Sequence, residues 1–453
     1  MLTLEFVLTS LPEARLVGPP DDIAIGGVAI DSRRVRPGDM FVALRGESGD
    51  GHCYIADAVA RGAHIVLAET AEASDSGAVV IVDDTLTALQ TLSRAWRDRH
   101  PIPLVAVTGS VGKSTTKELI AQVLGSRYAT LKSEGNQNNE IGLPLTLLRL
   151  DESHQWAVVE MAMYAEGEIA TLCAIARPKI GVVTNVGPTH LGRLRSLDAI
   201  ARAKSELVCS LPADGLAVLN GDDTRVAAMA ALTAARSVRY GFSEGNDFRA
   251  IDIETRVLSG TAFTLRHGDA TVRIEMPLIG WHPIYAALAA AAVAVGSGLT
   301  LSDVAVALRE AEPLRLVPKT AACGATVLDD TYNASPASTL AALDALASTS
   351  GGPGRRIAVL GDMLELGDYE IEGHRVVGRR AAEVAQLLVV VGERGRIVGE
   401  AALANGLSDV CFATDNDDAV AHLKPLIRAG DIVLVKGSRG MAMESIVERL
   451  LAW

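Results

Sequence analysis

Short, continuous runs of apolar residues recur along the chain and alternate with stretches of helical periodicity. Between residues 101 and 312 these runs are LVAVTG, WAVVEM, IGVVTN and LAVLN, and between 313 and 453 they are ATVLDD, RIAVLGD, LLVVVG and DIVLVKG. Runs of this length without polar alternation are typical of strands that are buried on both faces of a sheet. Because helices separate the strands, the pattern predicts a parallel, doubly wound α/β sheet in each segment.

The N-terminal segment predicts a smaller, mixed α/β unit, with strands in GVAIDSR, HIVLAE and VVIVDD. Two stretches look like domain borders: a charged helix end meets HPIP, and Pro313 and Pro318 bracket an extended, charged connector. At 453 residues the chain is long enough for about three domains of ~150 residues each. We therefore expect domains at residues 1–100, 101–312 and 313–453.

Composition narrows the class of protein. A net charge of −13 argues against a general binder of nucleic acid or anionic membranes. The five cysteines are scattered and lack a C-x-x-C pair, which fits a reducing cytosol and argues against a zinc knuckle. MLTLEFVLTS lacks the features of a signal peptide, and the apolar run at 286–299 is shorter than the ~20 residues that span a bilayer. We expect a soluble, cytoplasmic protein in which that run is a buried, alanine-rich helix.

The first stretch that carries chemistry is VTGSVGKST, which lies between a buried strand and an amphipathic helix. The common phosphate loop, G-x-x-x-x-G-K-[ST], has its first glycine two residues before Gly109, so this loop is a variant. Gly109 and Gly112 let the backbone approach phosphate oxygens, and the helix that follows points its first N–H groups at them. Lys113 suits the β- and γ-phosphates, and the Ser114 hydroxyl suits Mg²⁺. The alternative, a strand–helix turn that needs small residues, does not explain the Lys-Ser pair.

Three further features accompany the loop. KSEGNQNNEIGLP offers amide groups suited to a sugar or peptide, although a solvated loop is the alternative. Glu160 and His190 stand at the carboxyl ends of predicted strands, where they are reasonable Mg²⁺ ligands; singly, such residues are more often satisfied surface or core groups. Lys204, in IARAKSELV, has no interpretation from the pattern alone. The prediction is an α/β protein with a small mixed N-terminal domain, a central P-loop ATPase domain and a C-terminal Rossmann-like domain.

Taken together, these strings resemble the Mur ligase family over nearly the whole chain. The N-terminal segment contributes DSRRVRPGDMFVALRG and DGH; the central one contributes TGSVGKSTTKE, GNQNNEIGLP and TNVGPTHL with ARAKSE; the last contributes LDDTYNASPAS, LGDMLELG and VLVKGSRGM. GNQNNEIGLP and DDTYNASP are typical of the members that join D-alanyl-D-alanine to UDP-N-acetylmuramoyl-tripeptide. They argue against the alternatives, another Mur ligase or a folylpolyglutamate-type ligase.

The resemblance implies sites for ATP and for two Mg²⁺ ions. The ATP-binding residues that it implies are Thr108, Gly109, Ser110, Val111, Gly112, Lys113, Ser114, Arg315 and Asp330. One Mg²⁺ would be held by Ser114 and Glu160. The second would be held by His190 and by Lys204, whose amine would be carbamylated by CO₂. The catalytic residues that it implies are Lys113, Glu160, His190, Lys204 and Arg315.

The resemblance also implies where the substrates bind. UDP-N-acetylmuramoyl-tripeptide would contact Ser32, Glu47, Ser48 and Gly49 through its nucleotide, and Asn138 and Asn139 through its peptide. D-Alanyl-D-alanine would lie near Asn333, Lys436 and Arg439. The tripeptide carboxylate would attack the γ-phosphate of ATP to form an acyl phosphate, from which the dipeptide amine would displace phosphate. We expect the enzyme to be a monomer.

The chain departs from the family pattern in two places. In GWHPIYAALAA, Pro283 and Ala286 stand where the family has asparagines that serve the nucleotide site, and Ala162 replaces a usual glycine. We therefore expect weakened ATP binding and measurable use of GTP, unless His282 or Tyr285 substitutes for the lost amides. The departure also supports an alternative of another class, a catalytically weakened homologue that binds muramoyl nucleotides. Retention of the implied catalytic residues and of Asp330 argues against it.

Overall fold

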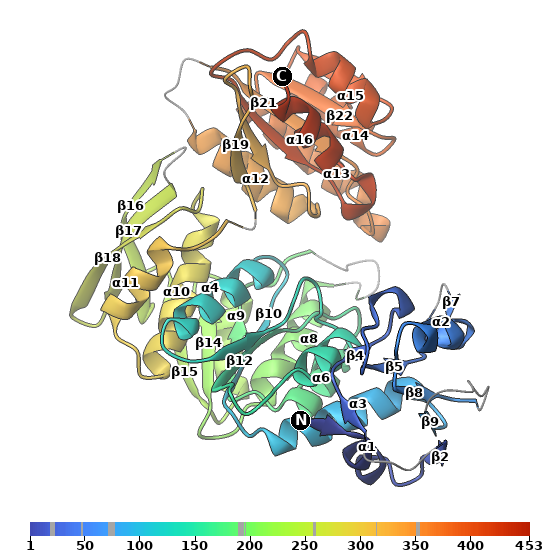
Figure 1. Cartoon of the computed structure of the whole chain (residues 1–453). Helices are drawn as coiled ribbons and strands as arrows, with labels where there is room; N and C mark the ends of the chain where they lie inside the picture. The colour runs from blue at the N-terminus through green and yellow to red at the C-terminus, as the bar shows by residue number, and fades with distance from the viewer. Residues whose placement is uncertain are drawn as a thin grey trace.

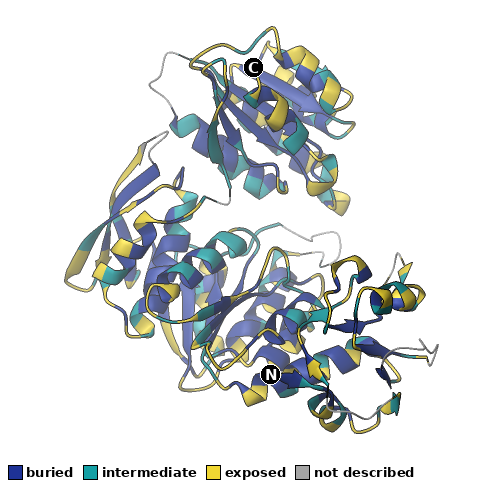
Figure 2. Ribbon diagram, viewed as in Figure 1, coloured by how far each residue is buried: buried dark blue, intermediate teal, exposed yellow. Residues whose placement is uncertain are grey.

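The computed structural model describes the chain except for residues 19–22, 47–48, 71–77, 189–193, 195, 257–259, 314 and 350–353. Its three large sheets lie one in each of the expected segments (Figure 1). Most of the continuous apolar runs form strands, and those of the central and C-terminal segments are almost wholly buried (Figure 2). The predicted α/β fold class is therefore confirmed.

The N-terminal sheet has five strands in the order β2-β9-β8-β5-β4, of which only β2 is antiparallel to its neighbour. Its strands are β2 (Arg15–Val17), β4 (Val28–Ala29), β5 (Met40–Val42), β8 (Ile65–Ala68) and β9 (Ala78–Ile81). Two small ladders pair β1 (Leu2–Thr3) with β3 (Ala24–Ile25) and β6 (Arg45–Gly46) with β7 (Gly49–Asp50). The helices are α1 (Leu4–Ser10), α2 (Ile55–Ala60) and α3 (Thr85–Arg99), with 3-10 turns η1 (Ser32–Arg34) and η2 (Gly51–Tyr54).

The central sheet has nine strands in the order β11-β12-β10-β13-β14-β15-β16-β17-β18. The parallel, doubly wound part comprises the four predicted strands, β10 (Leu104–Thr108), β12 (Trp156–Glu160), β13 (Ile180–Val183) and β14 (Leu216–Asn220). It also includes two strands that the apolar runs did not predict, β11 (Thr130–Lys132) and β15 (Arg236–Gly241). An extension that the apolar runs did not predict adds β16 (Phe248–Arg256), then β17 (Gly260–His267) and β18 (Ala270–Met276) in antiparallel pairing. These strands alternate polar and apolar residues, so they lack the continuous runs on which the prediction was based.

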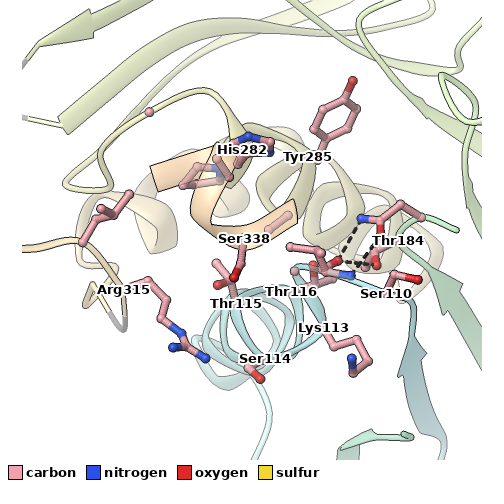
Figure 3. Close-up of a pocket in the computed structure, with 18 of the residues that line it drawn as sticks. Ser110, Lys113, Ser114, Thr115, Thr116, Thr184, His282, Tyr285, Arg315 and Ser338 are labelled. Atoms are coloured by element: carbon pink, nitrogen blue, oxygen red, sulfur yellow. Dashed lines mark hydrogen bonds between the residues drawn. The ribbon is translucent and has the colours of Figure 1, made fainter. Parts of the chain in front are cut away.

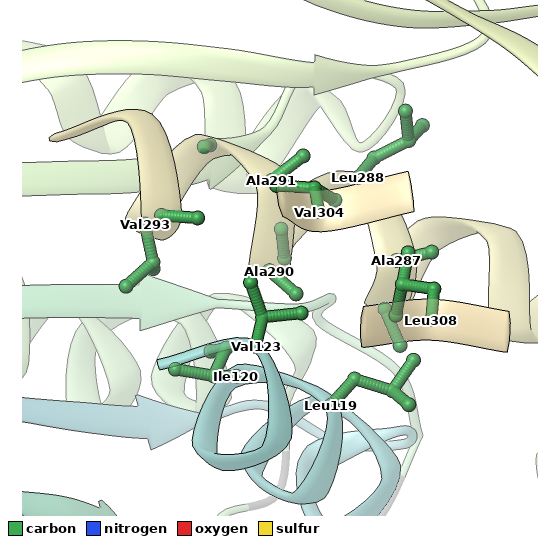
Figure 4. Close-up of a cluster of buried hydrophobic side chains, with 14 of the residues drawn as sticks. Leu119, Ile120, Val123, Ala287, Leu288, Ala290, Ala291, Val293, Val304 and Leu308 are labelled. Atoms are coloured by element: carbon green, nitrogen blue, oxygen red, sulfur yellow. The ribbon is translucent and has the colours of Figure 1, made fainter. Parts of the chain in front are cut away.

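The helices of the central segment cover this sheet on both sides. They are α4 (Lys113–Gly125), α5 (Gly142–Leu147), α6 (Glu168–Ala176), α8 (Leu197–Cys209), α9 (Thr224–Ala228), α10 (His282–Gly296) and α11 (Leu301–Arg309), with 3-10 turn η3 (Met229–Leu232). The predicted alanine-rich helix is α10, whose small side chains pack against Leu119, Ile120 and Val123 of α4 (Figure 4). In the part of the chain that is described, none of the helices combines the length and apolarity needed to cross a membrane.

The C-terminal sheet has six strands in the order β19-β20-β24-β21-β22-β23. They are β19 (Val317–Thr320), β20 (Thr326–Asp329), β21 (Arg356–Gly361), β22 (Leu387–Val391), β23 (Val410–Ala413) and β24 (Ile432–Lys436). The helices are α12 (Pro336–Ser348), α13 (Glu370–Val384), α14 (Gly395–Ala404), α15 (Asn416–Leu423) and α16 (Glu444–Leu451), with 3-10 turns η4 (Gly367–Tyr369) and η5 (Arg439–Met441). Part of the predicted connector is strand β19, an antiparallel edge strand that tolerates Pro318 because an edge leaves one side unpaired.

One of the two expected domain borders is crossed by an apolar core, and the other largely separates two cores. One cluster continues across residue 100, where Leu89, Leu92 and Trp96 of α3 pack with Leu143 of α5 and Leu172 of α6. The C-terminal sheet instead has its own cluster on each face, which among the described residues takes in Ile279 alone from the central segment. The N-terminal and central segments therefore share a core, and the C-terminal segment packs separately (Figure 1).

Candidate active site

A cavity of about 560 Å³ lies between the central and C-terminal sheets. One side of the cavity is formed by the glycine loop, by residues at the carboxyl ends of β12, β13 and β14, and by the 278–286 segment. The other side is formed by α12 and by residues at the carboxyl ends of β20 and β24. Figure 3 shows His282 and Tyr285 on one side of the cavity and Lys113 and Ser114 on the other. Ligands of open α/β sheets bind at the carboxyl ends of the strands, and both sheets point those ends into this cavity.

The glycine loop connects β10 to α4 and is held by two residues that follow β13. The Val111 N–H donates to Asn185 Oδ1 (2.9 Å), and the Val111 carbonyl accepts from Thr184 Oγ1 (2.7 Å) and from Asn185 Nδ2 (2.9 Å). Gly112 is the N-cap of α4 in a left-handed conformation with φ +85°, which favours glycine. The sequence analysis includes Thr184 and Asn185 in IGVVTN and TNVGPTHL but gives them no role; their place after a buried strand was the available signal.

The loop presents a site for an anion. Lys113 begins α4, its ammonium donates to the Gly109 carbonyl (3.0 Å), and the first turn of the helix holds no acidic residue. Burial lowers the pKa of Lys113, against the opposing effect of nearby Glu160. Free N–H groups and the positive end of a helix dipole bind phosphate, so the loop has the properties that its sequence predicts.

Glu160 lies beside the loop with both carboxylate oxygens oriented. Oε2 accepts from Ser114 Oγ (2.8 Å), Oε1 accepts from Asn138 Nδ2 (2.8 Å), and the residue is 3% exposed. Its backbone N–H donates to Ser133 Oγ (3.0 Å), and the ammonium of buried Lys117 donates to the Ser133 carbonyl (2.7 Å). Sequence reasoning missed Lys117 and Ser133, which support Glu160 from behind.

A hydroxyl and a carboxylate oxygen are hard ligands, so the pair fits Mg²⁺. No three His, Cys, Asp or Glu side chains in the described part of the chain gather as a metal site. Ser114 and Glu160 therefore fit an ion that takes its other ligands from phosphate and water, which is the usual preference of Mg²⁺. His190, the other expected ligand, lies outside the described residues.

Lys204 projects from α8 and is 2% exposed. Burial, together with the charge of Lys113, lowers the pKa of Lys204 well below its usual range. Within the described residues no carboxylate forms an ion pair with it. The amine is thus held near the phosphate loop in conditions that favour its neutral form.

On the C-terminal side, Lys436 and Asp330 form a buried ion pair in which Nζ and Oδ2 are 2.6 Å apart. Lys436 also donates to the Asn333 carbonyl (2.8 Å). Arg315 lies over the ring of Tyr332, with Nη1 3.7 Å from Asp330 Oδ1. All five residues line the cavity.

The other expected contacts are more scattered. Asn138 lines the cavity, whereas Asn139 accepts from the Gly142 N–H (2.9 Å) near the start of α5. Arg439 is exposed, pairs with Glu444 and does not line the cavity. Three further residues do not line the cavity: Thr108, whose hydroxyl donates to the Met161 carbonyl, and Ser32 and Gly49, which belong to the N-terminal unit. Glu47 and Ser48 lie outside the described residues.

The 278–286 segment forms the aromatic end of the cavity. The Tyr285 hydroxyl donates to Asp222 Oδ2 (3.0 Å) and is therefore engaged. His282 Nε2 is buried and has no hydrogen-bond partner among the described residues. Burial lowers the pKa of His282 to about 4, so the imidazole is neutral at physiological pH, and the ring stacks on Trp281 at 3.7 Å between centroids. Of the two residues expected to replace the missing amides, only His282 has a free buried polar atom.

Comparison with known proteins decides the family. Three family models match in order along the chain: the Mur ligase family catalytic domain at residues 24–108, the Mur ligase middle domain at 107–294, and the Mur ligase glutamate ligase domain at 314–439. The UDP-N-acetylmuramoyl-tripeptide–D-alanyl-D-alanine ligase of Synechocystis is 39% identical over 95% of this chain and 93% of that protein. This chain belongs to the Mur ligase family. The resemblance inferred from the motifs is confirmed.

Solved structures of Mur ligases extend the agreement to three dimensions. MurF from Acinetobacter baumannii has a TM-score of 0.89 and 32% identity, with 99% of this chain and 98% of that chain aligned. MurF from Thermotoga maritima, in complex with ADP, has a TM-score of 0.82 and 28% identity, with 94% and 97% aligned. The arrangement of the three sheets is thus shared with solved Mur ligase structures over nearly the full chain.

Proposed function

We propose that this chain is the ATP-dependent ligase that joins D-alanyl-D-alanine to UDP-N-acetylmuramoyl-tripeptide in peptidoglycan synthesis. Relatives named for this reaction align with nearly all of the chain. The observation that carries the proposal is the cavity in which the glycine loop and Glu160 face Asp330 and Lys436. A phosphate site and a second binding surface, supplied by different sheets, suit a reaction in which a carboxylate is first phosphorylated and then meets an amine.

The residues on the cavity wall have distinct parts in this reaction. Lys113 and the N–H groups of the loop bind the β- and γ-phosphates, and Arg315 approaches the transferred phosphoryl group from the C-terminal side. Ser114 and Glu160 would hold Mg²⁺, which when bound would supply positive charge to neutralise the phosphates. The tripeptide carboxylate oxygen attacks the γ-phosphorus and ADP leaves; the dipeptide amine then attacks the acyl carbon, and phosphate leaves as the amine loses a proton. Packing of the two sheets around the cavity excludes water from the acyl phosphate.

We also propose that Lys204 is carbamylated and, with His190, holds a second Mg²⁺. Carbamylation requires a neutral amine, and the surroundings of Lys204 lower its pKa. The product is a carboxylate, which would supply the negative charge that no described side chain gives Lys204. The modification converts a buried amine close to Lys113 into a metal ligand.

For the other substrate contacts, we propose that the N-terminal unit binds the UDP moiety through Ser32 and residues 47–49. Asn138 meets the peptide from its place in the cavity, and Asn139 holds the loop that carries it. Asn333 and Arg439 bind the dipeptide. The domains that we propose are residues 1–100, 101–312 and 313–453. We further propose that the enzyme acts as a cytoplasmic monomer. The five cysteines are free, which fits a reducing compartment.

The direct test is a ligation assay with purified UDP-N-acetylmuramoyl-tripeptide, ATP and Mg²⁺, with and without D-alanyl-D-alanine. We expect ADP, phosphate and the pentapeptide product by mass spectrometry only when the dipeptide is present. Lys113→Ala and Glu160→Ala should abolish the product, whereas Lys179→Ala, which changes a lysine paired with exposed Asp214, should not. Tight binding of the UDP substrate without any product would instead support the weakened homologue.

A further inference from the structure

The ion pair between Lys436 and Asp330 is set by the backbone of two neighbouring parallel strands. Asp329 in β20 pairs in register with Val435 in β24, and the Asp330 N–H donates to the Val435 carbonyl (3.0 Å). The two side chains therefore leave adjacent strand ends at the same height. They are 2% and 5% exposed, so the pair is fixed inside the wall of the cavity.

Lys436 has little capacity left for a substrate. Its ammonium donates to Asp330 Oδ2 (2.6 Å) and to the Asn333 carbonyl (2.8 Å), which uses two of its three N–H groups. The Asn333 contact holds the turn after β20. A substrate carboxylate would have to displace Asp330 to reach this buried ammonium.

Asp330, in contrast, has one oxygen committed and one free. Oδ1 is buried and has no hydrogen-bond partner among the described residues, and Arg315 Nη1 is 3.7 Å away. A buried carboxylate oxygen without a partner is costly, so it is a position that a ligand donor can complete. Lys436 thus engages Oδ2 and leaves Oδ1 of this cavity-lining residue without a hydrogen bond.

We propose that Lys436 is a positioning residue for Asp330 and does not contact the dipeptide. This inference rests on the proposed ligase function. Lys436 presents Asp330 Oδ1 to a hydrogen-bond donor of a ligand bound in the cavity and balances the charge of Asp330. Arg315 consequently stays available for the phosphoryl group. Without Lys436, the cation that remains beside the buried carboxylate among the described residues is Arg315, and a buried charge draws the partner within reach.

The first test is steady-state kinetics of Lys436→Met and Lys436→Gln. We expect Lys436→Met to lower kcat by roughly 100-fold, the usual cost of a misplaced catalytic group, with KM for D-alanyl-D-alanine within about twofold of wild type. Gln should recover part of kcat because its amide still donates to Asp330. Lys319→Met is the control, because Lys319 pairs with Asp329, the residue that precedes Asp330 (Nζ to Oδ2, 2.7 Å), and neither Lys319 nor Asp329 lines the cavity. This variant should leave both constants unchanged. A rise of about tenfold in KM for the dipeptide with little loss of kcat would overturn the proposal.

The second test separates this inference from the ligase function itself. In a crystal structure of Lys436→Met, Asp330 should pair directly with Arg315; an unmoved Asp330 with Oδ1 still free would contradict the inference, whatever the activity. Losses in kcat/KM for Asp330→Asn and Lys436→Met should be non-additive in the double variant, since both act through one carboxylate. Losses that multiply would also contradict it. Absence of product from the wild-type enzyme would reject the ligase function. The position of Asp330 in the Lys436→Met crystal structure would then still decide whether Lys436 positions Asp330.

Discussion

At the scale of single residues, the cavity is defined by which polar atoms already have partners. Four buried side-chain atoms in the described residues lack a hydrogen bond, and two of them, His282 Nε2 and Asp330 Oδ1, belong to residues that line the cavity. Leaving such an atom unpaired costs about 1–3 kcal/mol. The cavity therefore has two built-in positions that a bound ligand can satisfy.

For His282 we predict a role in recognising the nucleotide base. Pro283 and Ala286 provide no side-chain hydrogen bond, so His282→Leu should raise KM for ATP by roughly 2- to 13-fold, the value of one hydrogen bond of ~0.5–1.5 kcal/mol. The preference for ATP over GTP should shrink in the same variant. Tyr285→Phe is the matched control, because the Tyr285 hydroxyl is engaged by Asp222. Unchanged ATP and GTP kinetics in His282→Leu would mean that the base is recognised elsewhere.

For Lys204 we predict a carbamate in the active enzyme. Lys204→Ala should be nearly inactive, and a short carboxylic acid at high concentration should restore part of the rate by supplying the missing carboxylate. NMR with ¹³C-labelled CO₂ should show the carbamate signal in wild type and not in the variant. An unmodified amine in a high-resolution map of the active enzyme would contradict the prediction.

At the scale of elements, the loop after β10 depends on close contact with the segment after β13. A Cβ on Gly109 would lie 1.8 Å from Thr184 Oγ1, and Gly109 has φ +149°. Only glycine lets Thr184 reach the Val111 carbonyl. The phosphate loop is thus shaped by a neighbouring strand as much as by its own sequence.

We therefore predict that Gly109→Ala displaces the loop and lowers kcat/KM by roughly 100-fold, as expected when a catalytic group moves by about 1 Å. Gly125→Ala, in the last turn of α4, is the control, because a Cβ there meets nothing within 4 Å. Isothermal titration with ADP should show the loss of binding in the first variant alone. Normal ADP affinity in Gly109→Ala would show that the loop tolerates the displacement.

At the scale of the whole molecule, the N-terminal and central segments share one core, whereas the C-terminal segment has its own. The buried guanidinium of Arg97 strengthens the junction by donating to the carbonyls of His100, Ile102 and Ala176. The C-terminal segment is joined through residues 313–316 and the cavity wall. Movement between the two bodies would open or close the cavity and, among the described core residues, would shift Ile279 relative to the C-terminal core.

We predict that Leu92→Ala, in the shared core, lowers the free energy of unfolding by about 2–5 kcal/mol. Hydrogen exchange should show the loss of protection in both the N-terminal and central segments. Leu343→Ala, in the C-terminal core, should lower protection in that segment alone. Confinement of the Leu92→Ala effect to residues 1–100 would mean that the N-terminal unit unfolds independently.

The amino-acid sequence alone determined the strands at the centre of the central and C-terminal sheets and the alanine-rich helix. A continuous apolar run is stable only when buried on both faces, so its place follows from local pattern. Strands β15 to β18 and the edge strand β19 escaped prediction, because half-exposed strands are specified by their neighbours. The sequence also marked Lys113 and Ser114, since the glycine-loop pattern demands those residue types, and Glu160, since it ends a buried strand.

Only the tertiary structure decided which polar groups meet and which stay free. Lys436 and Asp330 are 106 residues apart, and Thr184 reaches Val111 across 73. These pairings arise from strand order and register, which join distant parts of the chain and leave no local periodicity in the sequence. The engaged hydroxyl of Tyr285 and the free Nε2 of His282 are likewise consequences of packing. The local sequence pattern predicts whether a side chain is buried, but its hydrogen-bond or ion-pair partner is determined by the tertiary structure.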